Sequence, residues 1–337
     1  WQYGLASIAP RWNISGSYMQ VLPRLISIDA LGVEREFLLD YFDDPYEALS
    51  MVFLKGYQWP FDSEKVMDGS SVIDLLVYRE CILRKRRVYL DYRANPFHLV
   101  DLEYERLFPE AYKYLSDAKV CFGTPIRRLE KMNLPAVDLY RGKGIDLTTE
   151  KLEIALCAQH HNGGAAVDLW WQTSIPGLYA VGECAGTHGV SRPGGSALNA
   201  GQVGAVRAAQ HITASKSTQI QDSAFLHIAE KAYFHHSAFC KKMLEQKNNV
   251  DESIVAARRR MSDCGGVIRQ HTAMKAALQE TTEQMREMET VVGVGEPAHL
   301  EYAYQLQDLL LTQQAVLTAM LDFGKVIGYT RGSALYC

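Results

Sequence analysis

The residues best able to do chemistry are grouped in one segment of the chain. An apolar run from Leu178 to Val181 is followed by Gly182-Glu183, a glycine-rich loop and a helix that we expect to begin at Ser196. We expect the apolar run to form a β-strand. A strand that ends at a carboxylate and leads to a helix N-terminus is a common way for an α/β protein to bind sugar hydroxyls beside an anionic group. The pattern therefore predicts a cofactor site.

The helix expected from Ser196 has the features of an anion-binding N-terminus. Gly194 and Gly195 precede it and carry no Cβ that would block a ligand. The first-turn amides of Ser196, Ala197 and Leu198 have no intrahelical acceptor, and the helix dipole favours negative charge there by about 0.3–1 kcal/mol. The anionic N1–C2=O end of a reduced flavin is a suitable acceptor. An ordinary capped helix with a glycine-rich entry is the alternative.

Three further side chains extend the site hypothesis. A carboxylate at Glu183 needs hydrogen-bond donors after an apolar strand, and ribityl or ribose hydroxyls supply them; helix capping or an arginine pair is the alternative. Arg192 suits a substrate carboxylate by bidentate geometry, or forms a structural salt bridge. His160 follows an expected strand and is a candidate for binding a substrate oxygen. We predict no metal site, because consecutive histidines such as His160-His161 do not face the same way.

Composition narrows the class of protein. The formal net charge of −4 from 35 basic and 39 acidic residues does not indicate a nucleic-acid partner. The run Arg84–Arg87 is interpreted as a solvated helix end. Seven cysteines without a Cys-x-x-Cys pair indicate free thiols in a reducing compartment, so we expect a cytoplasmic protein. No apolar segment reaches the length of a membrane span, which is about 20 residues.

The elements that position these residues change character along the chain. Short extended runs, including Gln20–Leu22 and Leu25–Ile28, come first and are followed by helical patterns. Leu152–Ala158 reads as an apolar strand that ends just before His160. From Ser223 onwards the pattern is helical almost throughout.

With these residues in view, the chain resembles the FAD-dependent family of fumarate reductase and succinate dehydrogenase flavoproteins and L-aspartate oxidase. The resemblance rests on Pro176–Glu183, on Arg192–Leu198, and on Gly163-Gly164 with Asp168; it is weaker in Thr330–Ser333. No Gly-x-Gly-x-x-Gly occurs in a βαβ context, so we find no N-terminal fingerprint half of the FAD site. A partner chain carrying that half is one expectation, and a chain that is part of a longer protein is the other.

The resemblance implies a partial α/β FAD-binding fold with an α+β capping domain and a C-terminal helical domain. Residues 1–152 would be the capping part, residues 153–222 the return segment of the FAD-binding domain, and residues 223–337 the helical domain.

The resemblance also implies a reaction and roles for the site residues. The activity would be hydride exchange between FAD N5 and a small, carboxylate-bearing substrate; an electron-transfer or structural subunit that completes a FAD site with a partner is the alternative. Arg192 would orient the carboxylate, His160 would bind substrate, and Tyr18 or Arg24 would supply the acid. The residues expected to bind FAD are Gly182, Glu183, Gly194, Gly195, Ser196, Ala197 and Leu198.

Overall fold

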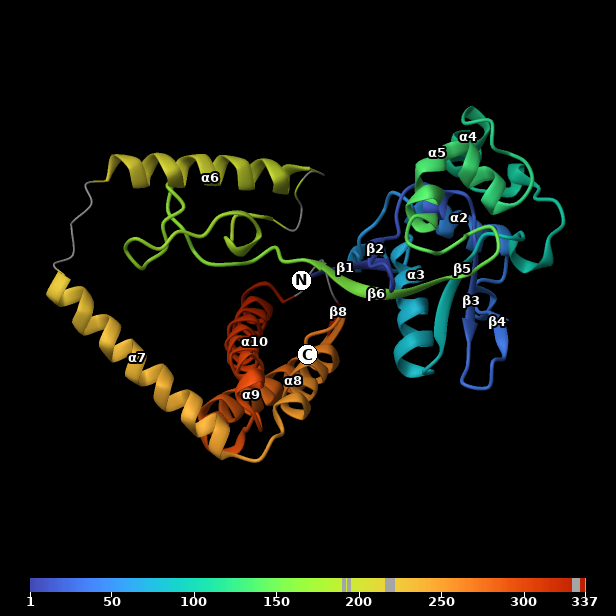
Figure 1. Cartoon of the computed structure of the whole chain (residues 1–337). Helices are drawn as coiled ribbons and strands as arrows, with labels where there is room; N and C mark the ends of the chain where they lie inside the picture. Colours follow the sequence, from blue (N-terminus) through green and yellow to red (C-terminus); the bar gives the residue numbers. More distant parts are fainter. Residues whose placement is uncertain (190–191, 193–194, 216–221, 329–333, 337) are drawn as a thin grey trace. The chain divides into compact units, whose positions relative to one another are not determined.

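The computed structural model describes residues 1–189, 192, 195–215, 222–328 and 334–336 (Figure 1). They fall into two compact units, unit 1 (Trp1–Asn162) and unit 2 (Gly163–Cys337).

Unit 1 is built on a six-stranded antiparallel sheet with the strand order β2-β1-β6-β5-β3-β4. Its strands are β1 (Gln2–Ser7), β2 (Trp12–Asn13), β3 (Arg24–Ile28), β4 (Glu34–Glu36), β5 (Arg87–Asp91) and β6 (Leu152–His160). The last strand of the unit lies between β1 and β5, so the two ends of this part of the chain meet inside the sheet. His160, at the end of β6, is paired with Gln2.

Helices surround this sheet in sequence order. They are α1 (Ser17–Gln20), η1 (Leu38–Asp40), α2 (Pro45–Lys55), η2 (Ser63–Lys65), α3 (Ser71–Tyr78), the π-helical η3 (Arg79–Leu83), η4 (Pro96–His98), η5 (Tyr104–Arg106), α4 (Pro109–Asp117) and α5 (Pro125–Arg141). Local chemistry sets several boundaries. Asp44 caps α2 by accepting a hydrogen bond from the Tyr46 amide at 3.0 Å, with Pro45 as the first helical residue. Within α5, Asn133 leaves helical geometry two residues before Pro135, which bends the helix there.

One continuous hydrophobic core fills unit 1. It joins the inner faces of the sheet strands to α2, α3 and α5, and it contains large side chains such as Phe37, Phe53 and Leu129 with no or almost no exposed surface. Buried polar groups in this core have named partners. Arg128, for example, donates to the carbonyl oxygen of Val21 at 3.0 Å and to Asn95 Oδ1 at 3.0 Å.

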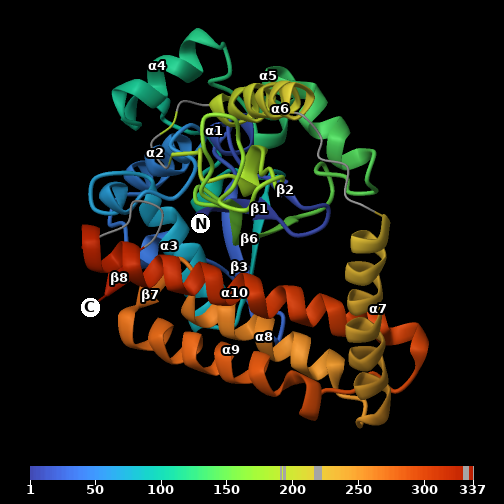
Figure 2. The same cartoon turned by 90° about the vertical axis from the view of Figure 1, so that its left-hand side faces the viewer.

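Unit 2 begins with an irregular segment and continues as helices. Its elements are η6 (Gly182–Cys184), α6 (Ser196–Ala214), α7 (Asp222–Glu245), α8 (Val250–Cys264), β7 (Ile268–Gln270), α9 (His271–Val291), η7 (Pro297–His299), α10 (Leu300–Ile327) and β8 (Ala334–Tyr336). Helices α8, α9 and α10 pack side by side (Figure 2). Their shared core includes Ile254, Met288 and Leu306, together with Met243 of α7.

The structure confirms most of the expected elements and corrects two. The helices after residue 223, the strand at 152–158 and the helix start at Ser196 are present. The strand expected at Leu178–Val181 is wrong: in the described chain Tyr179 makes only an isolated bridge to Gln172, because no neighbouring strand offers a ladder. The extended run Gln20–Leu22 is also wrong, since Gln20 ends α1 and Leu22 adopts a positive φ of 56°. The three-part domain division stays a prediction, and residues 153–160 lie in the sheet of unit 1.

Candidate cofactor site

The candidate site in unit 2 is a turn and a helix that approach each other through glycine. A Cβ added to Gly201 on α6 would lie 3.6 Å from the Cα of Gly182 in η6, so helix and turn are in contact there. On the other side of η6, a Cβ at Gly164 would lie 2.4 Å from the carbonyl oxygen of Cys184. That contact leaves no room for any side chain. Close backbone approach therefore explains Gly164, whereas a Cβ at Gly201 would make an ordinary van der Waals contact.

The N-terminus of α6 is open. Gly195 occupies the N-cap in a left-handed conformation with φ of 80°, and the described residues supply no side-chain cap. Gly182 also has a positive φ of 73°, and a Cβ built on either glycine would meet nothing within 4 Å. First-turn amides of a helix, here including those of Ala197 and Leu198, have no intrahelical acceptor and can donate to a ligand carbonyl. This donor set fits the pyrimidine end of a flavin.

The remaining predicted residues of this segment lie around the same turn and helix start. Glu183 is in η6 with an exposed side chain, Ser196 and Ala197 are half-buried, and Leu198 is 80% exposed. Gly194 lies outside the described residues. Arg192 is half-buried, and its Nε is a buried donor with no hydrogen-bond acceptor among the described residues. A buried guanidinium donor without an acceptor is costly, and it fits a site that binds an anionic group.

Sequence reasoning missed a cluster that supports α6 from residues 168–179. Asp168 Oδ1 accepts hydrogen bonds from the amides of Trp170 and Gln172 at 2.8 and 2.9 Å, which closes a tight turn. Trp171 takes a positive φ of 61° in this turn, and a Cβ at Gly204 of α6 would lie 2.5 Å from its indole nitrogen.

The rest of the cluster lies at the C-terminal half of α6. The Tyr179 hydroxyl and His211 Nδ1 are 2.6 Å apart, and Trp170 stacks on His211 with ring centroids 5.7 Å apart. Arg207 donates to the Leu169 carbonyl at 3.0 Å. The consecutive tryptophans after Asp168 were the available sequence clue to this cluster.

Three predicted catalytic residues lie in unit 1, and each makes contacts there. His160 Nδ1 is 3.2 Å from Asn162 Oδ1 at the end of β6. Tyr18 is buried, and its hydroxyl donates to the Ala136 carbonyl at 3.1 Å; burial, together with nearby Tyr140, raises the pKa of this hydroxyl.

Arg24 is held in a network of carboxylates. It donates to Glu36 at 3.0 Å and to Asp91 at 3.2 Å, and Glu34 lies 3.6 Å away. These contacts give Tyr18 and Arg24 structural roles, and the acid role of either stays a prediction.

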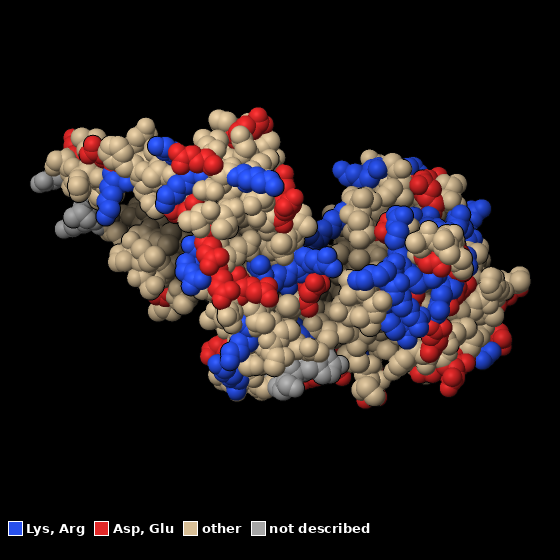
Figure 3. All heavy atoms as spheres, turned by 90° about the horizontal axis from the view of Figure 1, so that it is seen from below, with Lys and Arg blue, Asp and Glu red and all other residues tan. Residues whose placement is uncertain are grey.

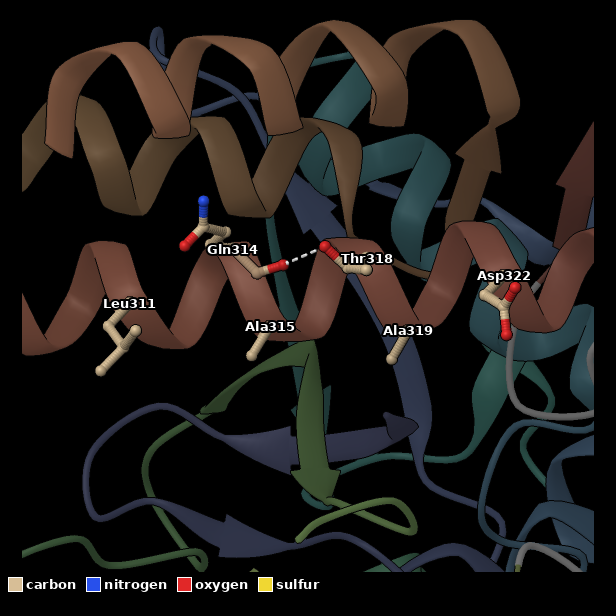
Figure 4. Close-up of a pocket in the computed structure, with 6 residues that line it drawn as sticks. All are labelled: Leu311, Gln314, Ala315, Thr318, Ala319 and Asp322. Carbon is tan, nitrogen blue, oxygen red and sulfur yellow. Dashed lines mark hydrogen bonds between the residues drawn. The ribbon is translucent and has the colours of Figure 1, made fainter. Parts of the chain in front are cut away.

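The described part of unit 2 also has a hollow on α10 (Figure 4). It is lined by Leu311, Gln314, Ala315, Thr318, Ala319 and Asp322. The Thr318 hydroxyl already donates to the Gln314 carbonyl at 2.7 Å. The lining offers a single charged group and no cluster of donors, so it is a poorer candidate for FAD than the start of α6.

Two further properties bear on the class of site. Within the described ranges, no group of three or more His, Cys, Asp or Glu side chains is placed to hold a metal ion. In those same ranges, no helix has both the length and the apolar character needed to cross a membrane.

Comparison with known sequences finds one family model and several relatives that match part of the chain. The family described as FAD binding domain matches residues 125–198, which include η6 and the start of α6. One polypeptide of the fumarate reductase (CoM/CoB) of Methanothermobacter marburgensis is 40% identical over 91 residues, or 27% of this chain and 16% of that protein. L-Aspartate oxidase of Bacillus subtilis is 41% identical over 71 residues, or 20% of this chain and 13% of that protein. Parts of this chain are therefore similar to the FAD binding domain family and to these two enzymes. FAD is accordingly its cofactor.

Solved structures support the same fold assignment. A quinol-fumarate reductase solved with menaquinol molecules aligns over 100% of this chain and 53% of its own, with a TM-score of 0.60 and 18% identity. Adenylylsulfate reductase from Archaeoglobus fulgidus aligns over 95% of this chain and 51% of its own, with a TM-score of 0.51 and 15% identity. The fold is therefore a mixed α/β arrangement like that of fumarate reductase flavoproteins. The chain spans about half the length of these structures and matches a smaller share of the curated relatives.

Proposed function

We propose that this chain forms the flavin-facing part of a FAD-dependent oxidoreductase that acts on a small organic substrate bearing a carboxylate. The observation that carries the proposal is the N-terminus of α6, which has no side-chain cap among the described residues, on a helix that contacts the Gly182 turn and begins inside the segment that matches the FAD-binding family. Bound FAD would supply hydride exchange at its N5 atom.

The chain's own residues have distinct tasks in this proposal. Glu183 accepts hydrogen bonds from hydroxyls of the cofactor's ribityl or ribose region. The amides of Ser196, Ala197 and Leu198 donate to the cofactor's pyrimidine oxygen, where the helix dipole also stabilises negative charge. Gly182, Gly194 and Gly195 keep side chains out of the cofactor's path.

Substrate binding is assigned to Arg192 and His160. The Arg192 Nε, which has no acceptor among the described residues, favours a role in holding a carboxylate, since a planar guanidinium binds carboxylate oxygens in bidentate fashion. His160 donates a hydrogen bond to a substrate oxygen, with Asn162 orienting its ring. Tyr18 and Arg24 remain the proposed proton donors. Both already make contacts within unit 1, so substitution has to test whether either one acts as the acid.

The deciding experiment substitutes Arg192 in the protein as it occurs natively and separates cofactor binding from substrate binding. We expect Arg192→Gln to retain the flavin absorbance spectrum, to raise KM for the carboxylate substrate and to lower kcat/KM by about a hundredfold, since a charge-assisted bidentate contact contributes about 3 kcal/mol. Arg207→Gln is the matched control, because in the described structure Arg207 donates to the Leu169 carbonyl and lies over the rings of Trp170 and Trp171. Equal kinetics for Arg192→Gln and the native protein would remove Arg192 from the site.

The alternative is an electron-transfer or structural subunit that completes a FAD site with a second chain. Native mass measurement of the purified protein tests it. A mass equal to one polypeptide plus FAD supports the oxidoreductase as a single chain, and a stoichiometric second polypeptide supports the shared site.

A further inference from the structure

One end of unit 1 gathers basic and apolar side chains from four elements. The basic residues are Arg35 of β4, Arg79 of η3, and Arg84, Lys85 and Arg86, which follow η3. The apolar residues are Leu31, Val33, Leu39, Tyr41, Ile82 and Leu83. We call this set the arginine face. Figure 1 shows the β3–β4 turn and the η3 end extending in the same direction, and Figure 3, seen from that side, shows Lys and Arg atoms gathered over this end.

Ion pairs hold the basic side chains of the face together. The Oδ2 atom of Asp40 is contacted by three guanidinium groups: Arg35, Arg79 at 3.4 Å and Arg84 at 2.9 Å. Arg84 also donates to the buried Glu80 at 2.7 Å. These contacts fix β4, η1 and η3 relative to one another within unit 1.

The β3–β4 turn is tied to the same face by Arg86. Its guanidinium donates to Asp29 at 3.0 Å and to the Val33 carbonyl at 2.6 Å. The turn residues and the η3 end therefore belong to one connected surface rather than to separate loops.

The face has more positive than negative groups. The guanidinium groups of Arg35, Arg79, Arg84 and Arg86 are paired with three carboxylates, those of Asp29, Asp40 and Glu80, and Lys85 adds a fifth cationic side chain, so the set has two more positive than negative groups. Arg35, Arg79 and Arg84 are each about a third exposed, at 35, 27 and 38%. Each guanidinium has five N–H donors, so donors remain for further acceptors.

Exposed apolar side chains flank these donors. Leu31 is 90% exposed at the tip of the β3–β4 turn, and Leu83 is 67% exposed at the end of η3. Tyr41, after η1, is 49% exposed. Arginine and tyrosine are enriched at protein interfaces, and the buried centre of an interface is more apolar than the rest of the surface.

We propose that the arginine face binds a protein partner that presents carboxylates beside apolar side chains. Charge complementarity argues for an acidic partner, because the face carries uncompensated positive charge. A protein fits better than an anionic membrane. Four of the five cationic groups are planar guanidinium groups held in place by ion pairs, a geometry that suits bidentate binding of carboxylates, and one is a lysine. This proposal does not depend on the cofactor site in unit 2.

The test measures binding of a labelled synthetic peptide of alternating glutamate and leucine by fluorescence anisotropy, using the full chain. We expect binding that weakens as salt rises, and at least about tenfold weaker binding of the same peptide with glutamine in place of glutamate. Arg35→Gln combined with Lys85→Gln should weaken binding about fivefold. This double variant keeps the ion pairs of Arg84 and Arg86 with Glu80. Leu83→Ser tests the apolar part separately and should weaken binding about threefold.

The control is Arg127→Gln with Arg141→Gln, which removes the same charge from unit 1 but alters ion pairs internal to α5. If both double variants weaken binding equally, binding depends only on the net charge of the protein and the proposal is overturned. Binding to phosphatidylglycerol vesicles without binding to the glutamate peptide would also overturn it, in favour of a membrane surface.

Discussion

Unit 1 and the segment 163–215 of unit 2 differ in how many of their side chains are buried against the rest of the same region. Unit 1 encloses a continuous core of aromatic and aliphatic side chains, and its buried arginine and tyrosine groups bond to named acceptors. In the described part of 163–215, only Ala185, His188, Gly204 and Ala208 are buried. Apolar side chains on α6 such as Val206, at 56%, are exposed instead.

The contrast reflects what the side chains of each region contact. The buried side chains of unit 1 pack against each other, so contacts within the unit stabilise its fold. In segment 163–215, glycines lie where backbones come close, and the described start of α6 has no side-chain cap. We therefore expect a bound ligand to supply contacts that the segment's own side chains do not. Binding of FAD should therefore stabilise α6 and leave unit 1 nearly unchanged.

The strongest perturbation breaks the core of unit 1. Lys55 and Asp74 form a salt bridge with no exposed surface on either side chain. Asp74→Leu leaves a buried ammonium without its partner and should lower the free energy of unfolding by about 3–5 kcal/mol, measured by urea denaturation with or without FAD. Lys55→Met combined with Asp74→Leu should recover most of that loss. If the double variant is as unstable as the single one, the pair is not the source of the effect.

The same pair gives a pH dependence with a defined sign. Burial raises the pKa of Asp74 from 3.8 to about 6, although Lys55 acts to lower it. The unfolded chain therefore loses this proton at lower pH than the folded one, and unit 1 loses stability from this group as pH rises from about 4 to 6, with no further loss above that. The double variant should not show this component in urea denaturation at matched pH values. An unchanged pH profile in the double variant would assign the dependence to other groups.

A smaller effect is expected in segment 163–215. Gly204→Ala places a Cβ against the Trp171 indole and should destabilise the packing of α6 by about 1–3 kcal/mol. Gly201→Ala is the matched control, because its Cβ makes an ordinary contact and alanine favours a helix by about 1 kcal/mol. Hydrogen exchange of α6 amides should therefore become faster in the first variant and slower in the second, while unit 1 amides stay unchanged. A change of equal size in unit 1 would show that the two regions are not independent.

The mildest substitution separates packing from catalysis at Tyr18. Tyr18→Phe removes the hydrogen bond to the Ala136 carbonyl and should cost about 0.5–1.5 kcal/mol of unfolding free energy. If the residue is structural, kcat stays unchanged. A fall in kcat at equal FAD content would make Tyr18 the acid and contradict its assignment to the core.

The sequence predicted the parts of the molecule that depend on local pattern. The uncapped helix at Ser196, the glycines around Gly182, and the strand leading to His160 follow from periodicity and from residues without a Cβ. The FAD assignment followed from the same motifs and is supported by the comparisons.

Features that depend on distant contacts were not predictable in this way. The run Leu178–Val181 has strand composition but finds no partner strand, and composition alone does not reveal that. Arg84–Arg87 was interpreted as solvated, whereas Arg84 bonds to Asp40 of η1 and Arg86 to Asp29 in the β3–β4 turn, in addition to the local pair of Arg84 with Glu80. The Trp171–Gly204 contact likewise joins residues on a turn and a helix whose approach no local pattern encodes.

The indole of Trp171 gives the protein an internal optical reporter. Its ring lies against Gly204 of α6 and under the Arg207 guanidinium, whose carbon is 5.9 Å from the ring centroid. Emission from this tryptophan depends on the polarity and charge around it, so a rearrangement of α6 would change its wavelength and intensity. With the other tryptophans replaced by phenylalanine, the fluorescence emission of Trp171 can be followed while FAD is added. A change in its wavelength would show that α6 rearranges when a ligand binds at the N-terminus of the helix.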